Sequence, residues 1–166
     1  MIRNNKKAIS AVIATVLIIL ITVAAITIIW AAIIPLINKQ LSSGTNCLDA
    51  VAQVQIVSDE GYTCKNLTAT TKYLQLQISH GAKDFTLADV QVLVSSGGVT
   101  KTLTLMNNAT GTVVLPDANE AKVYTLNIAD TTFLTNADKV EIAPVISVGN
   151  TQDTCEISSS AVINNC

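Results

Sequence analysis

The pattern of apolar and polar positions divides the chain into two parts. Residues 9–34 are apolar apart from one serine and three threonines, and no charged residue occurs between Lys7 and Lys39. A helix needs about 20 apolar residues to cross a bilayer core, and a secretory signal peptide has an apolar core of only about 7–15 residues. The pattern therefore predicts one continuous membrane-spanning helix over 9–34.

The end of this helix is predicted from a proline and a glycine. Pro35 lacks a backbone donor and crowds the preceding turn, so we expect a kink or a stop there. The helix is expected to resume through Gln40 and to end at Gly44, because glycine accepts the left-handed backbone that closes a helix. These signals predict a helical segment over 9–44 and a head over 45–166.

From residue 50 onward the pattern changes to an alternation with a period of two, which is typical of strands with one buried face. Turn signals rich in glycine, aspartate and asparagine separate the short runs. The predicted fold class is therefore α+β: a long N-terminal hydrophobic α-helix followed by an antiparallel β-sandwich of immunoglobulin-like architecture. The predicted strands are 51–57, 73–78, 90–94, 101–105, 123–128, 140–142 and 161–163.

Charge is distributed unevenly between the two parts. All twelve carboxylates lie at residue 49 or later together with six lysines, so this region carries a formal charge of −6. Arg3 is the only arginine. An acidic surface without arginine does not suit a phosphate backbone, and an aromatic content of 4% offers little for base stacking. We therefore expect no nucleic-acid partner.

A basic cluster directly precedes the apolar segment, at Arg3, Lys6 and Lys7. Basic residues that flank a membrane helix stay on the cytoplasmic side. The N-terminus is thus expected in the cytoplasm, and everything after Lys39 is expected outside.

The cysteines follow the apolar segment, and no pair has the C-x-x-C spacing of a metal or haem site. In the oxidising environment expected outside the membrane, two disulfides are favoured over free thiols. Four cysteines allow three connectivities. We favour local pairing, which joins Cys47 to Cys64 and Cys155 to Cys166, although the second bridge requires a bend within 156–165.

Two N-glycosylation sequons start at Asn66 and Asn108, and such tripeptides also arise by chance in threonine-rich sequence. No nucleophile elbow, phosphate-binding glycine loop or zinc-protease motif is present, so nothing supports an enzyme. No cofactor is expected either.

Two polar segments of the head have a functional and a simpler interpretation. His80 is the only histidine, and its Ser-His-Gly context predicts a solvated loop residue and not a ligand or base. Asp117, Asn119 and Glu120 offer oxygen ligands for Ca²⁺, but their spacing matches no strong loop motif. A plain turn without metal is therefore favoured.

Small residues recur on one face of the predicted helix. Such a stripe lets helices approach closely in a membrane, although alanine is common in any membrane helix. Trp30, the sole tryptophan, is either an interface anchor or a packing residue. The small residues are Ala8, Ala11, Thr15, Thr22, Ala25 and Ala32.

The first forty residues resemble the precursors of archaeal type IV pilins, which carry a class III signal peptide. The resemblance rests on a basic flank, a small residue at the junction and a helix that begins at once. The residues that carry it are Lys6, Lys7, Ala8, Ile9 and Ser10.

This resemblance implies that a membrane-embedded prepilin peptidase cuts between Ala8 and Ile9, so that 1–8 is a leader peptide. It implies that the helix is kept and polymerises into the core of a homopolymeric filament. Bacterial type IV pilins usually have glutamate at the fifth mature position, and Ile13 there fits the archaeal branch. Archaellins usually have glycine before the cut, so Ala8 favours an adhesive pilin.

The expected function is therefore a structural subunit of an extracellular archaeal type IV pilus, inserted in the cell membrane before the assembly machinery adds it to the filament. Two alternatives stay open. The chain could instead be a monomeric cell-surface binding module that keeps its anchor, or an archaellin of a motility filament.

Overall fold

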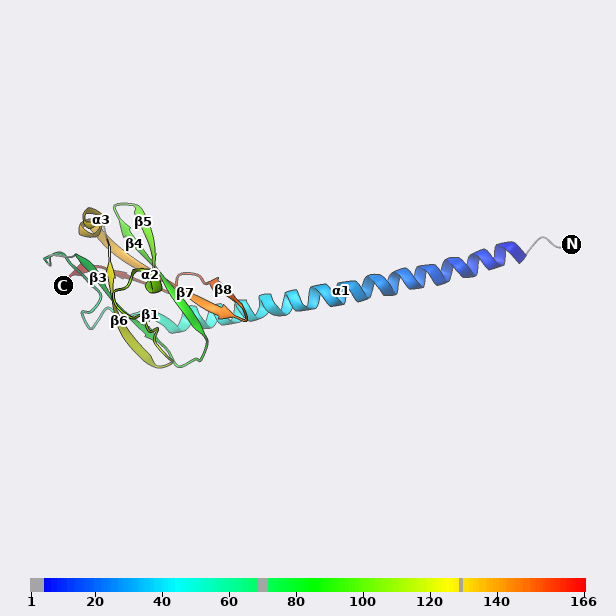
Figure 1. Cartoon of the computed structure of the whole chain (residues 1–166), viewed down its shortest axis with the longest axis horizontal. Helices are drawn as coiled ribbons and strands as arrows, with labels where there is room; N and C mark the ends of the chain where they lie inside the picture. The colour runs from blue at the N-terminus through cyan, green and yellow to red at the C-terminus, as the bar shows by residue number, and fades with distance from the viewer. Residues whose placement is uncertain (1–4, 69–71, 129) are drawn as a thin grey trace. The chain divides into compact units, whose positions relative to one another are not determined.

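The computed structural model describes residues 5–68, 72–128 and 130–166, with side chains from residue 11 onward (Figure 1). The chain divides into two compact units, Met1–Leu41 and Ser42–Cys166. From residue 5 onward the first is helix, and the second is a mostly antiparallel β-rich head, as the sequence pattern predicts.

Helix α1 spans Asn5–Gln53 and continues through Pro35. The predicted alternative of a stop at this proline is therefore wrong, and so is the predicted end at Gly44, which has no left-handed backbone. The last turns are held within the head, where Ala50 is fully buried and the Gln53 carbonyl accepts a hydrogen bond from Gly81 N at 2.9 Å. Packing of this kind stabilises helices more than local propensity does.

The strands of the head form two five-stranded sheets within the described residues. Among the strands that the structure describes, all pairs are antiparallel except β2 with β10. The first sheet contains β1 (Val54–Ile56), β2 (Cys64–Asn66), β3 (Tyr73–His80), β6 (Glu120–Asn127) and β10 (Asn164–Asn165). The second contains β4 (Leu87–Ser96), β5 (Val99–Thr104), β7 (Ala137–Val148), β8 (Thr151–Thr154) and β9 (Ser159–Val162).

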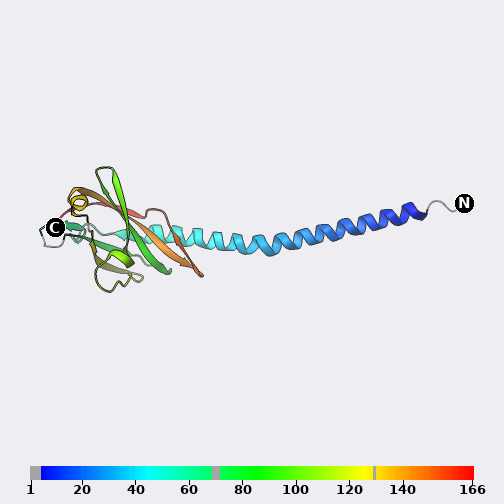
Figure 2. The ribbon, with the colours of Figure 1, turned by 45° about the horizontal axis from the view of Figure 1, so that its top comes forward.

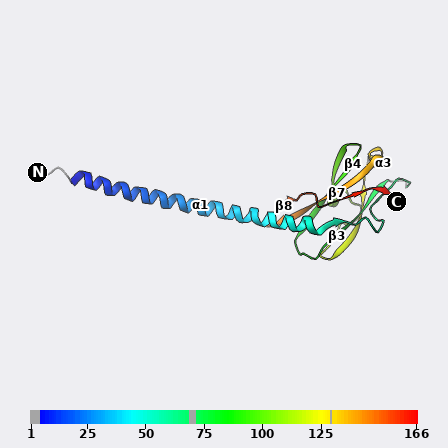
Figure 3. The ribbon, with the colours of Figure 1, turned by 180° about the vertical axis from the view of Figure 1, so that it is seen from behind.

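Strand β7 organises the second sheet. It is the long orange strand of the head in Figure 2, and it pairs with β4, β8 and β9. Strand β3 has the same role in the first sheet, where it pairs with β1, β2 and β6. Figures 1 and 3 both show β8 beside the last turns of α1, a contact that includes a 2.6 Å hydrogen bond from Ser43 Oγ to Asp153 Oδ2.

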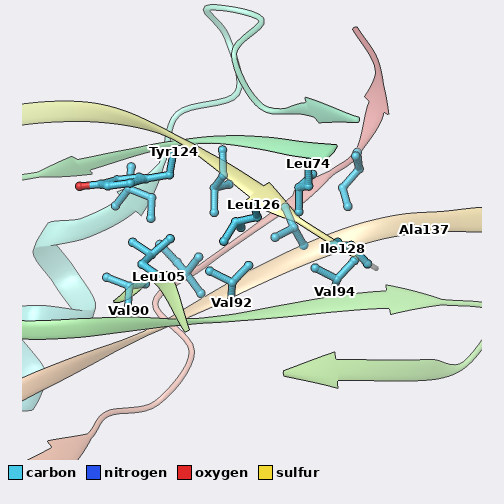
Figure 4. Packing of buried hydrophobic residues seen from close by; sticks show 14 of the residues in the cluster. Leu74, Val90, Val92, Val94, Leu105, Tyr124, Leu126, Ile128 and Ala137 are labelled. Carbon is cyan, nitrogen blue, oxygen red and sulfur yellow. The ribbon is translucent and has the colours of Figure 1, made fainter. Parts of the chain in front are cut away.

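The main hydrophobic core of the head is filled from both sheets (Figure 4), and a smaller cluster of Ala50, Ile146 and Cys155 lies where α1 meets β7 and the Cys47–Cys155 bridge. Alternate residues of β3, β4 and β6 point into the main core, which is why these strands show the period of two in the sequence. Two short helices that the sequence pattern missed, α2 (Leu105–Asn108) and α3 (Thr131–Asn136), add Leu105 and Leu134. The labelled core side chains in Figure 4 include Leu74, Val90, Val92, Val94, Tyr124, Leu126 and Ile128.

The predicted strands lie largely where the structure has them, but 51–53 belongs to α1 and residue 105 to α2. The sequence pattern missed β2, β8 and β10. Strands β8 and β10 are polar and mostly exposed, so they show no apolar alternation that would mark them.

Candidate functional sites

Helix α1 exposes a long apolar surface in the first unit. Its large apolar side chains are exposed, and Trp30 reaches 65%. The best window has a mean hydropathy of 3.1, which makes α1 the one helix in the described part of the chain that is long and apolar enough to cross a membrane. This surface is compatible with membrane insertion, and both interpretations of Trp30 stay open.

The threonines of α1 bind their own helix. Thr15, Thr22 and Thr27 donate their hydroxyl protons to the carbonyls three residues earlier, at 2.8, 2.9 and 2.8 Å. Each hydroxyl is therefore satisfied without water or a second chain, as a helix in hydrocarbon requires. That the small residues pack helices together stays a prediction.

The predicted cleavage motif lies in the first turns of α1. The backbone of 6–10 is helical. The side chains of these residues lie outside the described part of the chain, so recognition by a peptidase stays a prediction.

Both disulfides join residues far apart in the sequence. The bridges are Cys47–Cys155 and Cys64–Cys166, with Cα–Cα distances of 5.3 and 5.1 Å. The predicted presence of two disulfides is confirmed, but the favoured local pairing is wrong. Parallel pairing of β10 with β2 places Cys166 near Cys64, and Cys166 N donates to Lys65 O at 3.1 Å. Topology, and not sequence distance, decides the pairing.

His80 is buried, so the predicted solvated loop position is wrong. The side chain is only 4% exposed at the end of β3, and its ring centroid lies 4.4 Å from that of Phe85. Nδ1 lies 3.0 Å from Pro116 O and Nε2 lies 3.1 Å from Lys83 O. Both ring nitrogens therefore lie within hydrogen-bonding distance of a backbone carbonyl, and a neutral imidazole donates to one of the two. His80 thus links two loops of the head.

A small hollow of about 250 Å³ opens beside His80 and Phe85. Asp84 and Asp117 contribute exposed carboxylates to its lining. In the residues that the structure describes, no three histidine, cysteine, aspartate or glutamate side chains gather as a metal site would require. We assign no ligand to this hollow.

The predicted turn at 117–120 is confirmed. Glu120 N donates to Asp117 O at 3.0 Å, and Asp117 N donates to Glu120 Oε2 at 2.9 Å. Asn119 has a positive φ of 63°, a conformation that asparagine tolerates well. The hydrogen bond from Lys122, followed by that from Asp117 N, holds the pKa of Glu120 below its usual value. These contacts account for the polar residues as parts of a hydrogen-bonded turn.

Both sequon asparagines are half-buried and use their amide groups locally. Asn66 donates to the Tyr73 hydroxyl at 3.1 Å and accepts from Thr68 N at 3.1 Å. Asn108 Oδ1 accepts from Thr104 N at 3.1 Å. A glycan on Asn66 Nδ2 would have to replace the Tyr73 contact, and glycosylation stays a prediction at both positions.

Comparison with family models, curated proteins and solved structures finds no match to this chain. The functional argument therefore depends on the residues and contacts described above.

Proposed function

We propose that this chain is a structural subunit of an extracellular archaeal type IV pilus. The observation that carries the proposal is the uncovered apolar surface of α1, which follows a basic cluster and precedes a disulfide-bonded β-rich head. The helix polymerises into the filament core. The head forms the outer, adhesive surface, and the subunit needs no cofactor.

The proposed life of the subunit has two stages. As a precursor it lies in the membrane with 1–8 in the cytoplasm. Prepilin peptidase then cuts between Ala8 and Ile9, which removes Arg3, Lys6 and Lys7 and releases the chain from that side. The satisfied hydroxyls of the α1 threonines suit both stages, because neither lipid nor a packed helix supplies water.

The energetics support assembly. Between residues 11 and 41, 18 large apolar side chains are each at least 38% exposed. Full burial of such a side chain stabilises by about 1.5–3 kcal/mol, so covering this surface yields tens of kcal/mol before costs. Association costs about 4–15 kcal/mol. Copies of the same helix can therefore hold a filament together without covalent links.

We also propose that the two sheets of the head form a β-sandwich of immunoglobulin-like type. The main core, filled from both sheets, and the mostly antiparallel pairing support this architecture. In the filament the sequons at Asn66 and Asn108 would present glycans on the outer surface.

The N-terminus of protein sheared from cells tests the function. We expect filaments whose subunits begin at Ile9 in mass spectrometry. A chain that keeps 1–8 and stays in the membrane without filaments would instead be a monomeric anchored module, and the proposal would be rejected.

A charge-reversal pair tests the leader. Replacing both leader lysines, Lys6→Glu with Lys7→Glu, should leave uncleaved precursor in the membrane. Lys39→Glu is the matched control, because it reverses a charge beyond the apolar segment, and it should be processed normally. Normal processing of the double variant would show that the basic cluster is no part of the signal.

A further inference from the structure

An open groove runs along the last turns of α1 within the head. Its volume is about 290 Å³. Leu48 is 74% exposed beside it, and the Cys47–Cys155 bridge forms part of its wall. The groove is lined by Gly44, Cys47, Leu48 and Val51 on the helix and by Thr154, Cys155 and Glu156 opposite.

No backbone angle or close contact within this chain requires a glycine at position 44. Gly44 lies inside a helix, its φ is not positive, and a Cβ added there would meet nothing within 4 Å. Glycine inside a helix costs about 0.5–1 kcal/mol relative to alanine. Small residues at such positions let a second helix approach closely, so the missing side chain points to a contact with another chain.

The spacing along α1 indicates the kind of contact. Gly44, Leu48 and Val51 follow one another at intervals of four and three residues, which is the spacing of a helix–helix seam. Ala50, on a different face of the same turns, is fully buried in the head. The head therefore covers one face of these turns and leaves Gly44, Leu48 and Val51 at the groove.

The groove suits an apolar helix better than a small molecule. Its volume lies just below the range of typical ligand pockets, which is about 300–1,000 Å³. Glu156 is the one charged residue among its lining residues, and it is exposed. An uncharged occupant can therefore enter the groove without breaking an ion pair or burying an unpaired charge of its own.

We propose that this groove receives the apolar helix, residues 11–38, of a second copy of the chain. That segment has no charged residue, and its large apolar side chains are exposed. The region from residue 49 carries −6, so contacts between two heads are opposed by charge and contacts between head and helix are not. The inference rests on the proposed function and names the head surface that takes part in assembly.

Filling the groove tests the inference. A Cβ at position 44 meets nothing within 4 Å, so Gly44→Leu places its side chain in the open groove, and the head should fold and form both disulfides. The yield of sheared filaments should fall at least about tenfold, which corresponds to about 1.4 kcal/mol of lost contact. Thr45→Leu is the matched control, because Thr45 is exposed on the next position and does not line the groove. Its yield should equal that of the unchanged chain, and equal yields for both variants would overturn the inference.

Photo-crosslinking identifies the occupant. A benzophenone amino acid in place of Leu48 should link two full-length chains, with the second attachment within 11–38. Filaments that form with attachment to another head, or without any attachment, would overturn the groove assignment and leave the pilus proposal intact. Absence of filaments from the unchanged chain would overturn the pilus proposal and the groove assignment together.

Discussion

The crossed disulfides lead to a quantitative prediction about the stability of the head. Each bridge spans a long segment, with sequence separations of 108 and 102 residues. In the loop-closure account, a loop of about 100 residues closed alone stabilises the folded state by about 4.7 kcal/mol. Because the two bridges overlap in sequence, they do not contribute independently.

The effective loop is much shorter once one bridge exists. With Cys64–Cys166 formed, the path from Cys47 to Cys155 runs through 17 residues to Cys64 and 11 residues from Cys166, about 28 in all. Closing a loop of this length stabilises by about 3.5 kcal/mol. The same path applies when the other bridge forms first. Loss of either bridge alone should therefore cost about 3.5 kcal/mol, and loss of both about 8 kcal/mol.

The assay is urea unfolding of the full chain in a fixed detergent, followed by near-ultraviolet circular dichroism of the head. The variants are Cys47→Ala with Cys155→Ala, Cys64→Ala with Cys166→Ala, and all four together. The loss of about 8 kcal/mol approaches the whole stability of a typical domain, about 5–15 kcal/mol. The four-fold variant should thus be largely unfolded, and reduction of the unchanged chain should reproduce it.

Fragment mapping provides an independent check of the pairing. Cleavage after lysine and glutamate places each cysteine on its own fragment: 40–60, 61–65, 142–156 and 157–166. The structure requires 40–60 linked to 142–156, and 61–65 linked to 157–166. Links between 40–60 and 61–65 would refute the pairing. The loop argument would be refuted if the four-fold variant lost no more free energy of unfolding than a variant that lacks one bridge.

Three further predictions concern single residues of the head. Burial raises the pKa of Tyr124 to about 12, so stability should fall between pH 10 and 12, where only the unfolded tyrosine ionises, and Tyr124→Phe should show a weaker fall in alkaline unfolding. The hydrogen bond from Lys101 lowers the pKa of Asp130, so the contribution of this pair to folding stability should be present above about pH 4 and lost on acidification. Asp130→Asn should make the fall of stability at acid pH slightly shallower, and the effect is small because both side chains are exposed. Gly81→Ala places a Cβ against the end of the Gln53 side chain, which must turn away and give up its contact with Lys83 N. It should therefore lower the melting temperature only slightly, and Gln53→Ala should remove that loss.

The sequence predicts those parts of the fold that depend on local periodicity. Apolar residues at 74, 76 and 78 alternate in the chain and are buried in the core. The same alternation continues to His80, which is buried in turn. Extending the period of two by one step would have placed this histidine inside, although its turn-like Ser-His-Gly context indicated a loop.

Features that depend on distant contacts could not be predicted from the pattern. The end of α1 at Gln53 depends on Gly81, 28 positions later, and on the bridge to Cys155. The pairing of Cys64 depends on the short parallel ladder between β2 and β10. The groove beside Gly44 requires 154–156 to lie next to the helix, which no local signal reveals.

The position of these contacts also bears on how the head can recognise another chain. The bonds from Ser43 to Asp153, from Lys83 to Asp49 and from Gly81 N to the Gln53 carbonyl all act within Ser42–Cys166, as does the Cys47 bridge. The last turns of α1 thus belong to the head, although the sequence pattern predicts the end of the helix at Gly44. The groove has one wall on these turns and the other on 154–156, so the same bonds fix its shape in the unbound chain. Preorganisation of this kind lowers the ordering cost of binding, which favours the groove as a contact point in assembly.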